Sequence, residues 1–223
     1  MGLFSNIRER TADLWQPMLV RFDKQPIGTV VMLSDFMRTR SAYIAQTSLY
    51  GYLKTRMGTQ YVRIFEDPVF AQSIDVAKWR VFAACLSDLV IFSTATIHAG
   101  AGDAEQATPF AAHHYTTIIG NALGEADVGP LVEESVAAFL HRSKDTNWAN
   151  AAVGEAAFTH SPPALYHWAP IADELKRYDE EIVKNSIRYR WRDVRDQLRR
   201  RLDPVSVTED WRAMHMGQPT PAA

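Results

Sequence analysis

The run from Val81 to Ala99 constrains the fold most, because it is apolar on nearly every side of a helix. Such a helix is stable only where it is covered, either inside a protein core or inside a membrane. Its 19 residues are about the length of a membrane span. However, Asp88 lies near its midpoint, and the charged tripeptide Lys78-Trp79-Arg80 precedes it. We therefore predict a central core helix over residues 75–99, capped by Asp75, with a membrane span as the alternative.

Two other long stretches have helical spacing. Residues 29–57 contain no proline and place their apolar side chains on one broad stripe, and Gly58 follows as a C-cap. Residues 170–202 contain no glycine and, after the first residue, no proline. Apolar side chains recur in this stretch at intervals of three and four, at Ile171, Leu175, Tyr178 and Ile182. This spacing predicts one long helix that packs on the rest of the protein along most of its length.

Shorter patterns complete the organisation of the chain. Helical spacing or composition recurs in residues 3–22, 104–123, 129–142, 147–158 and 161–168. Asp67-Pro68 has the form of an N-cap followed by proline at the first helical position. We find no paired strand pattern, so we predict an all-α, single-domain bundle of about seven to nine helices over residues 1–204. Residues 205–223 are predicted to be a partly disordered tail with one helical turn around Trp211.

Composition excludes several classes of protein. The 223 residues carry 24 Lys and Arg and 26 Asp and Glu, a net charge of −2, which argues against a surface that binds nucleic acid throughout. A single cysteine, Cys85, excludes a disulfide scaffold and is expected to be a buried core residue. Charged residues among the first fifteen argue against a secretory signal peptide. We expect a cytoplasmic protein, with the inner face of the membrane as the alternative.

Known catalytic and cofactor motifs are missing from the sequence. It contains no Gly-x-Ser-x-Gly elbow, no phosphate-binding loop, no Glu-x-x-His pair and no cysteine–histidine spacing typical of zinc. His160-Ser161 is the only histidine–serine neighbour pair, and adjacency in sequence does not provide the geometry of a catalytic triad. The sequence therefore predicts neither a metal nor a cofactor.

Polar residues inside apolar stretches are the candidates for a pocket or buried polar network: Asp35, Arg38, Tyr43, Tyr50 and Asp88. A buried carboxylate is rarely unpaired, so we expect Asp88 to pair with an arginine from another helix. Arg38 and the arginines of residues 188–192 are the expected partners.

The strongest local signal is the arginine-rich and aromatic run near the C-terminus. Residues 184–203 carry eight basic and three acidic side chains. The candidate partner-binding residues are Arg188, Arg190, Trp191, Arg192 and Arg195. Such a run suits structural ion pairing, an acidic protein partner, or binding to nucleic acid or lipid headgroups. Nucleic acid is the least favoured of these partners.

Three segments together resemble an uncharacterised family of all-helical bacterial proteins that often carries an esterase label. They are residues 22–28, residues 45–61 and the run Asn185-Ser-Ile-Arg-Tyr-Arg-Trp-Arg-Asp-Val-Arg195. The resemblance covers most of the chain. It implies hydrolysis but supplies no catalytic residues for this sequence.

Three functions are consistent with these features. The first is a non-enzymatic helical subunit or adaptor that docks on a larger assembly through the helix at 170–202 and the N-terminal helix. Its expected partner is another protein or, in a homo-oligomer, a second copy of the chain. The second is a small-ligand-binding or hydrolytic protein with a pocket between the helices at 29–57 and 75–99. The third is a peripheral membrane protein that uses the N-terminal amphipathic helix and the arginine run.

Overall fold

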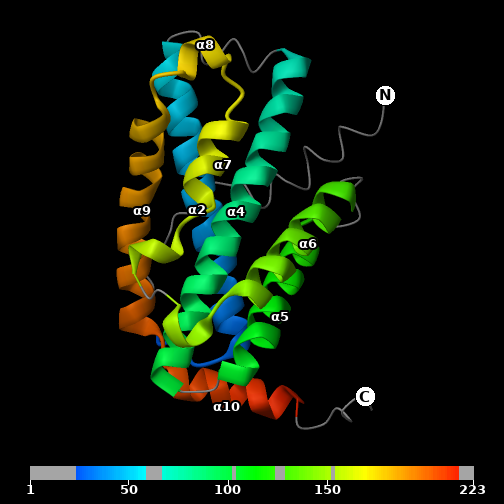
Figure 1. Ribbon diagram of the computed structural model, residues 1–223, viewed down its shortest axis with the longest axis vertical. Helices are drawn as coiled ribbons and strands as arrows, with labels where there is room; N and C mark the ends of the chain where they lie inside the picture. The colour runs from blue at the N-terminus through cyan, green and yellow to red at the C-terminus, as the bar shows by residue number, and fades with distance from the viewer. Residues whose placement is uncertain (1–23, 59–66, 102–103, 124–128, 152–153, 216–223) are drawn as a thin grey trace.

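The computed structural model describes residues 24–58, 67–101, 104–123, 129–151 and 154–215 (Figure 1). Within these ranges it contains eight α-helices, two short 3₁₀ turns and no sheet, which confirms the predicted all-α bundle. The predicted helix at 3–22, residues 59–66 and the last eight residues lie outside the described residues. The helices are α2 (Val30–Met57), α4 (Pro68–Ala101), α5 (Ala104–Leu123), α6 (Gly129–Asp145), α7 (Ser161–Trp168), α8 (Asp173–Lys176), α9 (Glu180–Arg201) and α10 (Pro204–His215).

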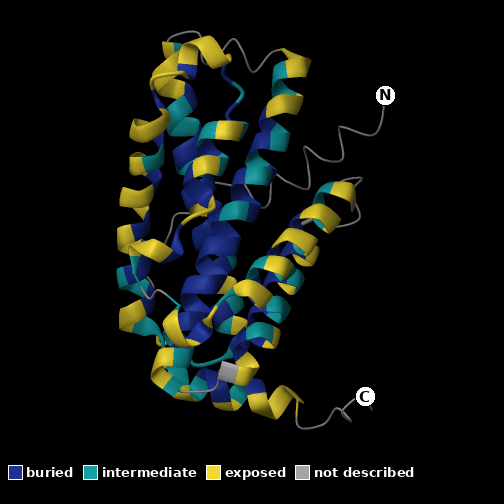
Figure 2. Ribbon diagram, in the orientation of Figure 1, coloured by how far each residue is buried: buried dark blue, intermediate teal, exposed yellow. Residues whose placement is uncertain are grey.

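Helix α4 is the central helix, and α2, α5, α7 and α10 pack around it (Figures 1 and 2). It is apolar and long enough to cross a membrane, but 83% of its most apolar window is buried inside the protein. This burial agrees with the predicted core helix. Cys85 is fully buried within it, and burial raises the pKa of its thiol well above the usual range.

The start of α4 lies about two turns earlier than the predicted Asp75 cap. The carboxylate of Asp67 accepts a hydrogen bond from the amide of Val69 at 2.9 Å, so Asp67 and Pro68 form the N-terminus. Asp75 lies inside the helix and pairs with Lys78 at 2.9 Å. The two helical signals at 67–68 and 75 therefore belong to one helix.

Helix α2 has the predicted bounds and termini. The hydroxyl of Thr29 accepts a hydrogen bond from the amide of Met32, which caps its N-terminus. At its C-terminus Gly58 adopts a φ of 52°, a left-handed conformation that favours glycine, and its amide donates to the carbonyl of Lys54.

The predicted single helix over residues 170–202 is wrong, because residues 170–172 and 177–179 are not helical and the chain bends between α8 and α9. The amide of Asp179 bonds to the carbonyl of Lys176 at 2.8 Å, and α9 begins at the next residue. Arg56 and Tyr52, near the end of α2, both donate to the carboxylate of Asp179. Arg56 thereby lowers the pKa of Asp179, and the pair fixes the bend against α2.

Two other predicted segments differ from the structure. Residues 147–158 were expected to form one alanine-rich helix, but their described part contains two 3₁₀ turns, at 148–150 and 155–157. The first half of the expected tail forms α10, which buries Val207 and Trp211 in the core. Helix α10 therefore closes one end of the bundle (Figure 1).

The described ends of the chain meet at that same end of the bundle. Ile27 pairs with the end of α9, donating to the carbonyl of Arg201 at 2.7 Å and accepting from the amide of Asp203 at 3.0 Å. The carboxylate of Asp210 in α10 accepts a hydrogen bond from the amide of Val30 at 2.8 Å. One amide of the first turn of α2 is thus satisfied by a residue 180 positions later.

Two helical glycines should respond in opposite ways to the same substitution. A Cβ at Gly100 would lie 2.9 Å from Cγ of Pro204, whose ring starts α10, whereas a Cβ at Gly120 would meet nothing within 4 Å. We expect Gly100→Ala to lower the free energy of unfolding by about 1–2 kcal/mol because α4 and α10 must separate. Gly120→Ala should raise it by up to about 1 kcal/mol through helix propensity. Urea unfolding of both variants checks this, and equal signs for the two would contradict the close contact.

Candidate functional site

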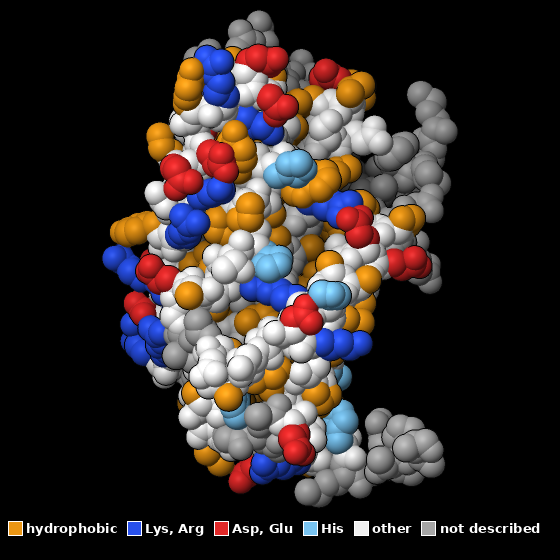
Figure 3. Space-filling view, viewed as in Figure 1, with side chains coloured by type: hydrophobic (Ala, Val, Ile, Leu, Met, Phe, Trp, Pro, Cys, Tyr) orange, Lys and Arg blue, Asp and Glu red, His pale blue; other side chains and the backbone are white. Residues whose placement is uncertain are grey.

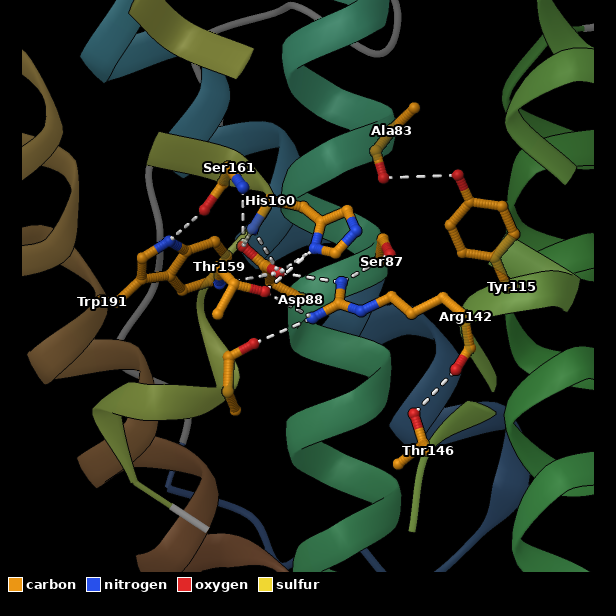
Figure 4. A network of polar contacts seen from close by, with 11 residues as sticks. Ala83, Ser87, Asp88, Tyr115, Arg142, Thr146, Thr159, His160, Ser161 and Trp191 are labelled. Carbon is orange, nitrogen blue, oxygen red and sulfur yellow. Dashed lines mark hydrogen bonds and ion pairs between the residues drawn. The ribbon is translucent and has the colours of Figure 1, made fainter. Parts of the chain in front are cut away.

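A buried ion pair between Asp88 of α4 and Arg142 of α6 lies at the centre of the polar network in Figure 4. Asp88 is completely buried, and its Oδ1 accepts a hydrogen bond from a terminal guanidinium nitrogen of Arg142 at 2.8 Å. The same nitrogen donates to the hydroxyl of Ser87 at 2.7 Å. Asp88 is therefore paired with an arginine from another helix, but the partner is neither Arg38 nor a member of the 188–192 run.

The carboxylate of Asp88 also holds the N-terminus of α7. It accepts hydrogen bonds from the backbone amides of Thr159, His160 and Ser161, with shortest distances of 3.3, 3.1 and 2.7 Å. These amides precede or begin α7, so a carboxylate from another helix satisfies donors that the helix itself cannot. A negative charge also suits the positive end of a helix dipole.

Arg142 extends the network to the loop before α7. Its second terminal nitrogen donates to the carbonyl of Ala157 at 3.0 Å and lies 3.3 Å from the hydroxyl of Thr159. On the far side, the indole of Trp191 in α9 donates to the hydroxyl of Ser161 at 3.0 Å. One buried charge pair thus links α4, α6, α7 and α9.

His160 is the member of this network that reaches solvent. Its side chain is 53% exposed, and its Nδ1 lies 3.0 Å from the Thr159 hydroxyl and 3.8 Å from Asp88. Its pKa is lowered, first by partial burial and then by the charge of Arg142, although Asp88 acts in the opposite direction. The imidazole is therefore neutral at pH 7 and can donate or accept a hydrogen bond.

Next to the network is a cavity of about 200 Å³ between α4, α5, α6 and α7. Figure 3 shows this face, where histidine and Lys or Arg side chains lie close together near the meeting of α4, α6 and α7. The lining combines small apolar, aromatic and polar side chains: Arg80, Ala83, Ala84, Ser87, Tyr115, Glu134, Ser135, Ala138, Phe139, His160, Ala164 and Trp168.

Arg80 is the charged group in the cavity with unused hydrogen-bonding capacity. One terminal nitrogen donates to the carboxylate of Glu134 at 2.7 Å, and the guanidinium lies 4.6 Å from the centre of the Trp168 ring. Its Nε is buried and has no hydrogen-bond partner among the described residues. Glu134 is 61% exposed, and the hydrogen bond from Arg80 lowers its pKa.

The other predicted pocket residues do not come together. Asp35 is exposed and pairs with Arg38 one turn away at 2.7 Å, while Tyr43 is exposed and Tyr50 packs beside Lys78. None of these four residues lines the cavity, and α2 is not one of its walls. The cavity described here is therefore not the predicted pocket between the helices at 29–57 and 75–99, and that pocket stays a prediction.

The predicted partner-binding residues divide into two groups. Trp191 is 1% exposed and packs against Phe158 with ring centres 4.6 Å apart, and Arg195 is buried and pairs with Glu155 at 2.8 Å. These two residues are internal, so they cannot contact a partner. Arg188, Arg190 and Arg192 are exposed.

Arg80, Glu134 and Arg142 were not among the predicted site residues, and His160 was considered only as the neighbour of Ser161. A signal for Arg142 was present, because residues 100–160 contain eight acidic side chains and two basic ones, Arg142 and Lys144. An isolated cation in an acidic segment is a natural partner for a buried carboxylate elsewhere.

The serines of this network lack a base, and Ser34, whose hydroxyl lies 2.7 Å from Nδ1 of His114, is paired with a completely buried imidazole outside the cavity. Ser161 is fully buried and accepts from Trp191, and the one hydrogen bond found for the Ser87 hydroxyl comes from Arg142. A nucleophilic serine needs a base within hydrogen-bond reach. Among the residues that the structure places, no group of three or more His, Cys, Asp or Glu side chains is positioned to hold a metal ion.

No protein-family model, curated protein or solved structure matches this chain. A function must therefore be inferred from the geometry of the molecule.

Proposed function

We propose that the protein binds a small organic carboxylate in the cavity between α4, α5, α6 and α7, with Arg80 as the carboxylate-binding residue. The observation that carries the proposal is the buried Nε of Arg80, which lacks a partner among the described residues. Buried donors are nearly always satisfied, so an unsatisfied one beside a cavity indicates a missing acceptor.

The geometry of Arg80 suits a carboxylate. Guanidinium groups bind carboxylates through two parallel N–H bonds, and Glu134 occupies only a terminal nitrogen. Because Glu134 is mostly exposed, its carboxylate can turn into solvent when a ligand replaces it. The Trp168 ring stays packed against the Arg80 guanidinium during this exchange, since aromatic rings commonly stack on arginine.

The rest of the cavity suits a compact, partly aromatic ligand. Tyr115 and Phe139 stack with ring centres 4.0 Å apart, and four alanines supply apolar wall. Its volume of about 200 Å³ corresponds to about seven water molecules. Ser87 and neutral His160 offer hydrogen bonds to a polar group on the ligand.

Calorimetric titration with benzoate and phenylacetate, beside the neutral amides of the same acids, tests this proposal. We expect the acids to bind and the amides to bind much more weakly. Arg80→Gln should weaken binding by about 10- to 100-fold, since a hydrogen bond to a charged group contributes about 1.5–3 kcal/mol. Glu134→Gln should strengthen binding several-fold, because it removes the competing carboxylate.

Arg38→Gln is the matched control, because Arg38 is paired with an aspartate on its own helix and lies away from the cavity. Binding of the control should equal that of the wild type. Equal affinity for acid and amide, or a loss of affinity in Glu134→Gln, would contradict the assignment of Arg80.

The exposed side of α9 favours a second function, docking on another protein chain. Ile182 and Tyr189 are 72% and 67% exposed, although they are large and apolar. Exposed apolar groups of this kind often mark protein contacts. This surface lies at the opposite side of α4 from α6 in Figure 1, so docking there would leave the cavity open.

A further inference from the structure

The outward side of α9 carries an apolar contact surface. Ile182 and Tyr189 are seven residues apart, which is about two helical turns, so they lie on the same side of the helix. Leu175 and Tyr178, just before α9, are 64% and 78% exposed. The sequence predicted that Leu175, Tyr178 and Ile182 pack on the protein body, and the structure corrects this. Figure 3 shows hydrophobic side chains among charged ones along the edge formed by α9.

The opposite side of α9 is already covered. Val183, Ile187, Val194 and Leu198 are buried against the bundle. The bend before α9 is held by Arg56 and Tyr52 through Asp179. The helix therefore presents Ile182 and Tyr189 on a rigid support and does not need a partner in order to form.

Charges along one flank of this surface are segregated by sign. One flank of α9, beside Ile182 and Tyr189, carries four charged residues. They follow one another at intervals of seven, four and seven residues, which keeps them on one side of the helix: Glu181, Arg188, Arg192 and Arg199. All four are exposed. Along this flank one acidic residue lies at the start of the helix and three arginines follow it. Lys184 pairs with Glu180 beside Glu181, and Asp193 and Asp196 lie 3.7 and 3.9 Å from Arg192 and Arg199. The helix also begins with Glu180-Glu181 and ends with Arg199-Arg200-Arg201.

We propose that two copies of this chain form a symmetric dimer by packing their α9 helices antiparallel. Ile182 and Tyr189 are equally far from the midpoint of residues 185 and 186. A two-fold axis at that midpoint places Ile182 of one copy against Tyr189 of the other, in both directions. This dimer rests on the second function proposed above, because it names a second copy of the chain as the protein that docks on α9.

Charge selects this orientation. In an antiparallel helix pair the same flanks of the two helices meet, so Glu181 of each copy lies near Arg188 and Arg192 of the other. A parallel pair would instead place the basic ends of both helices side by side, which like-charge repulsion opposes. The pattern is self-complementary, which favours a second copy over an unrelated acidic protein.

Sedimentation velocity over a range of protein concentrations tests the dimer. We expect the wild type to sediment as a dimer and Ile182→Glu to raise the dissociation constant at least about tenfold, because it places a charge at the centre of the contact. Val31→Glu is the matched control, since Val31 is also 72% exposed but lies on α2. Thermal melting by circular dichroism should show that both variants are folded.

A charge exchange makes the test specific for the antiparallel arrangement. Glu181→Arg should weaken the dimer, and so should Arg188→Glu combined with Arg192→Glu. The triple variant is again self-complementary and should recover the wild-type dissociation constant. A monomeric wild type, or a triple variant weaker than either parent, would overturn the proposal. Benzoate binding by the same samples reports on the cavity independently, so failure of one proposal is separable from failure of the other.

Discussion

Asp88→Asn is expected to lower the free energy of unfolding by about 3–5 kcal/mol, because it removes one partner of a buried ion pair. The variant keeps the size of the side chain but removes its charge. The amide group of asparagine also brings N–H donors to a site where Arg142 and three backbone amides already donate. Urea unfolding followed by circular dichroism measures the change.

Asp35→Asn is the control for this measurement. Asp35 also pairs with an arginine, Arg38, but the pair is solvent-exposed on one helix. Exposed pairs contribute at most about 1 kcal/mol, so the control should remain close to the wild type. A loss below about 1 kcal/mol in Asp88→Asn would mean that the carboxylate does not hold α7 and Arg142 in place.

Acid should destabilise the protein through His114 of α5. His114 is completely buried, and its Nδ1 lies 2.7 Å from the hydroxyl of Ser34 in α2. Burial, with a smaller contribution from His113, lowers the pKa of His114 from 6.5 to about 3. Between these two values the unfolded chain binds a proton that the folded chain does not, so stability is full above pH 6.5 and falls as the pH falls.

The size of this effect follows from the two pKa values. One proton contributes about 1.4 kcal/mol per pH unit, so His114 should remove about 2–3 kcal/mol of stability between pH 6 and pH 4. In His114→Gln that part of the pH dependence should disappear, whatever the stability of the variant at pH 7. The measurement is the difference between the two curves of unfolding free energy against pH.

Val31→Ala provides the comparison, because Val31 is 72% exposed and the change adds or removes no titratable group. Its pH curve should run parallel to that of the wild type. If His114→Gln also ran parallel, the buried imidazole would have to be protonated in the folded protein.

The long helices were predictable because their determinants are local. In α2 the spacing of apolar residues, a threonine cap and a terminal glycine act within a few residues of one another. The bend before α9 has no such determinant, since neither glycine nor proline occurs there. It accompanies bonds from Arg56 and Tyr52 to Asp179, more than 120 residues away in sequence. Local spacing does not contain that information.

The candidate site was predictable only in part, for the same reason. The position of Asp88 in an apolar helix predicts that its carboxylate needs a cation. Which cation it meets, Arg142, depends on how α6 is rotated against α4. Trp191 and Arg195 have the composition of a binding surface, yet Phe158 and Glu155 cover them from a loop about 35–40 residues earlier. The cavity takes its walls from four helices, so no single segment carries its pattern.

Two pairings between distant parts of the chain have a consequence for synthesis of the protein. Ile27 pairs with residues 201–203, and Val30 pairs with Asp210. On the ribosome, α2 emerges early, but the carboxylate that completes its first turn is made 180 residues later. Helices α2, α4 and α5 can associate while translation continues, since domains begin to fold as they emerge. The bundle can close at this end only after residues 201–210 have left the exit tunnel, so this end is completed after the other described helices have been made.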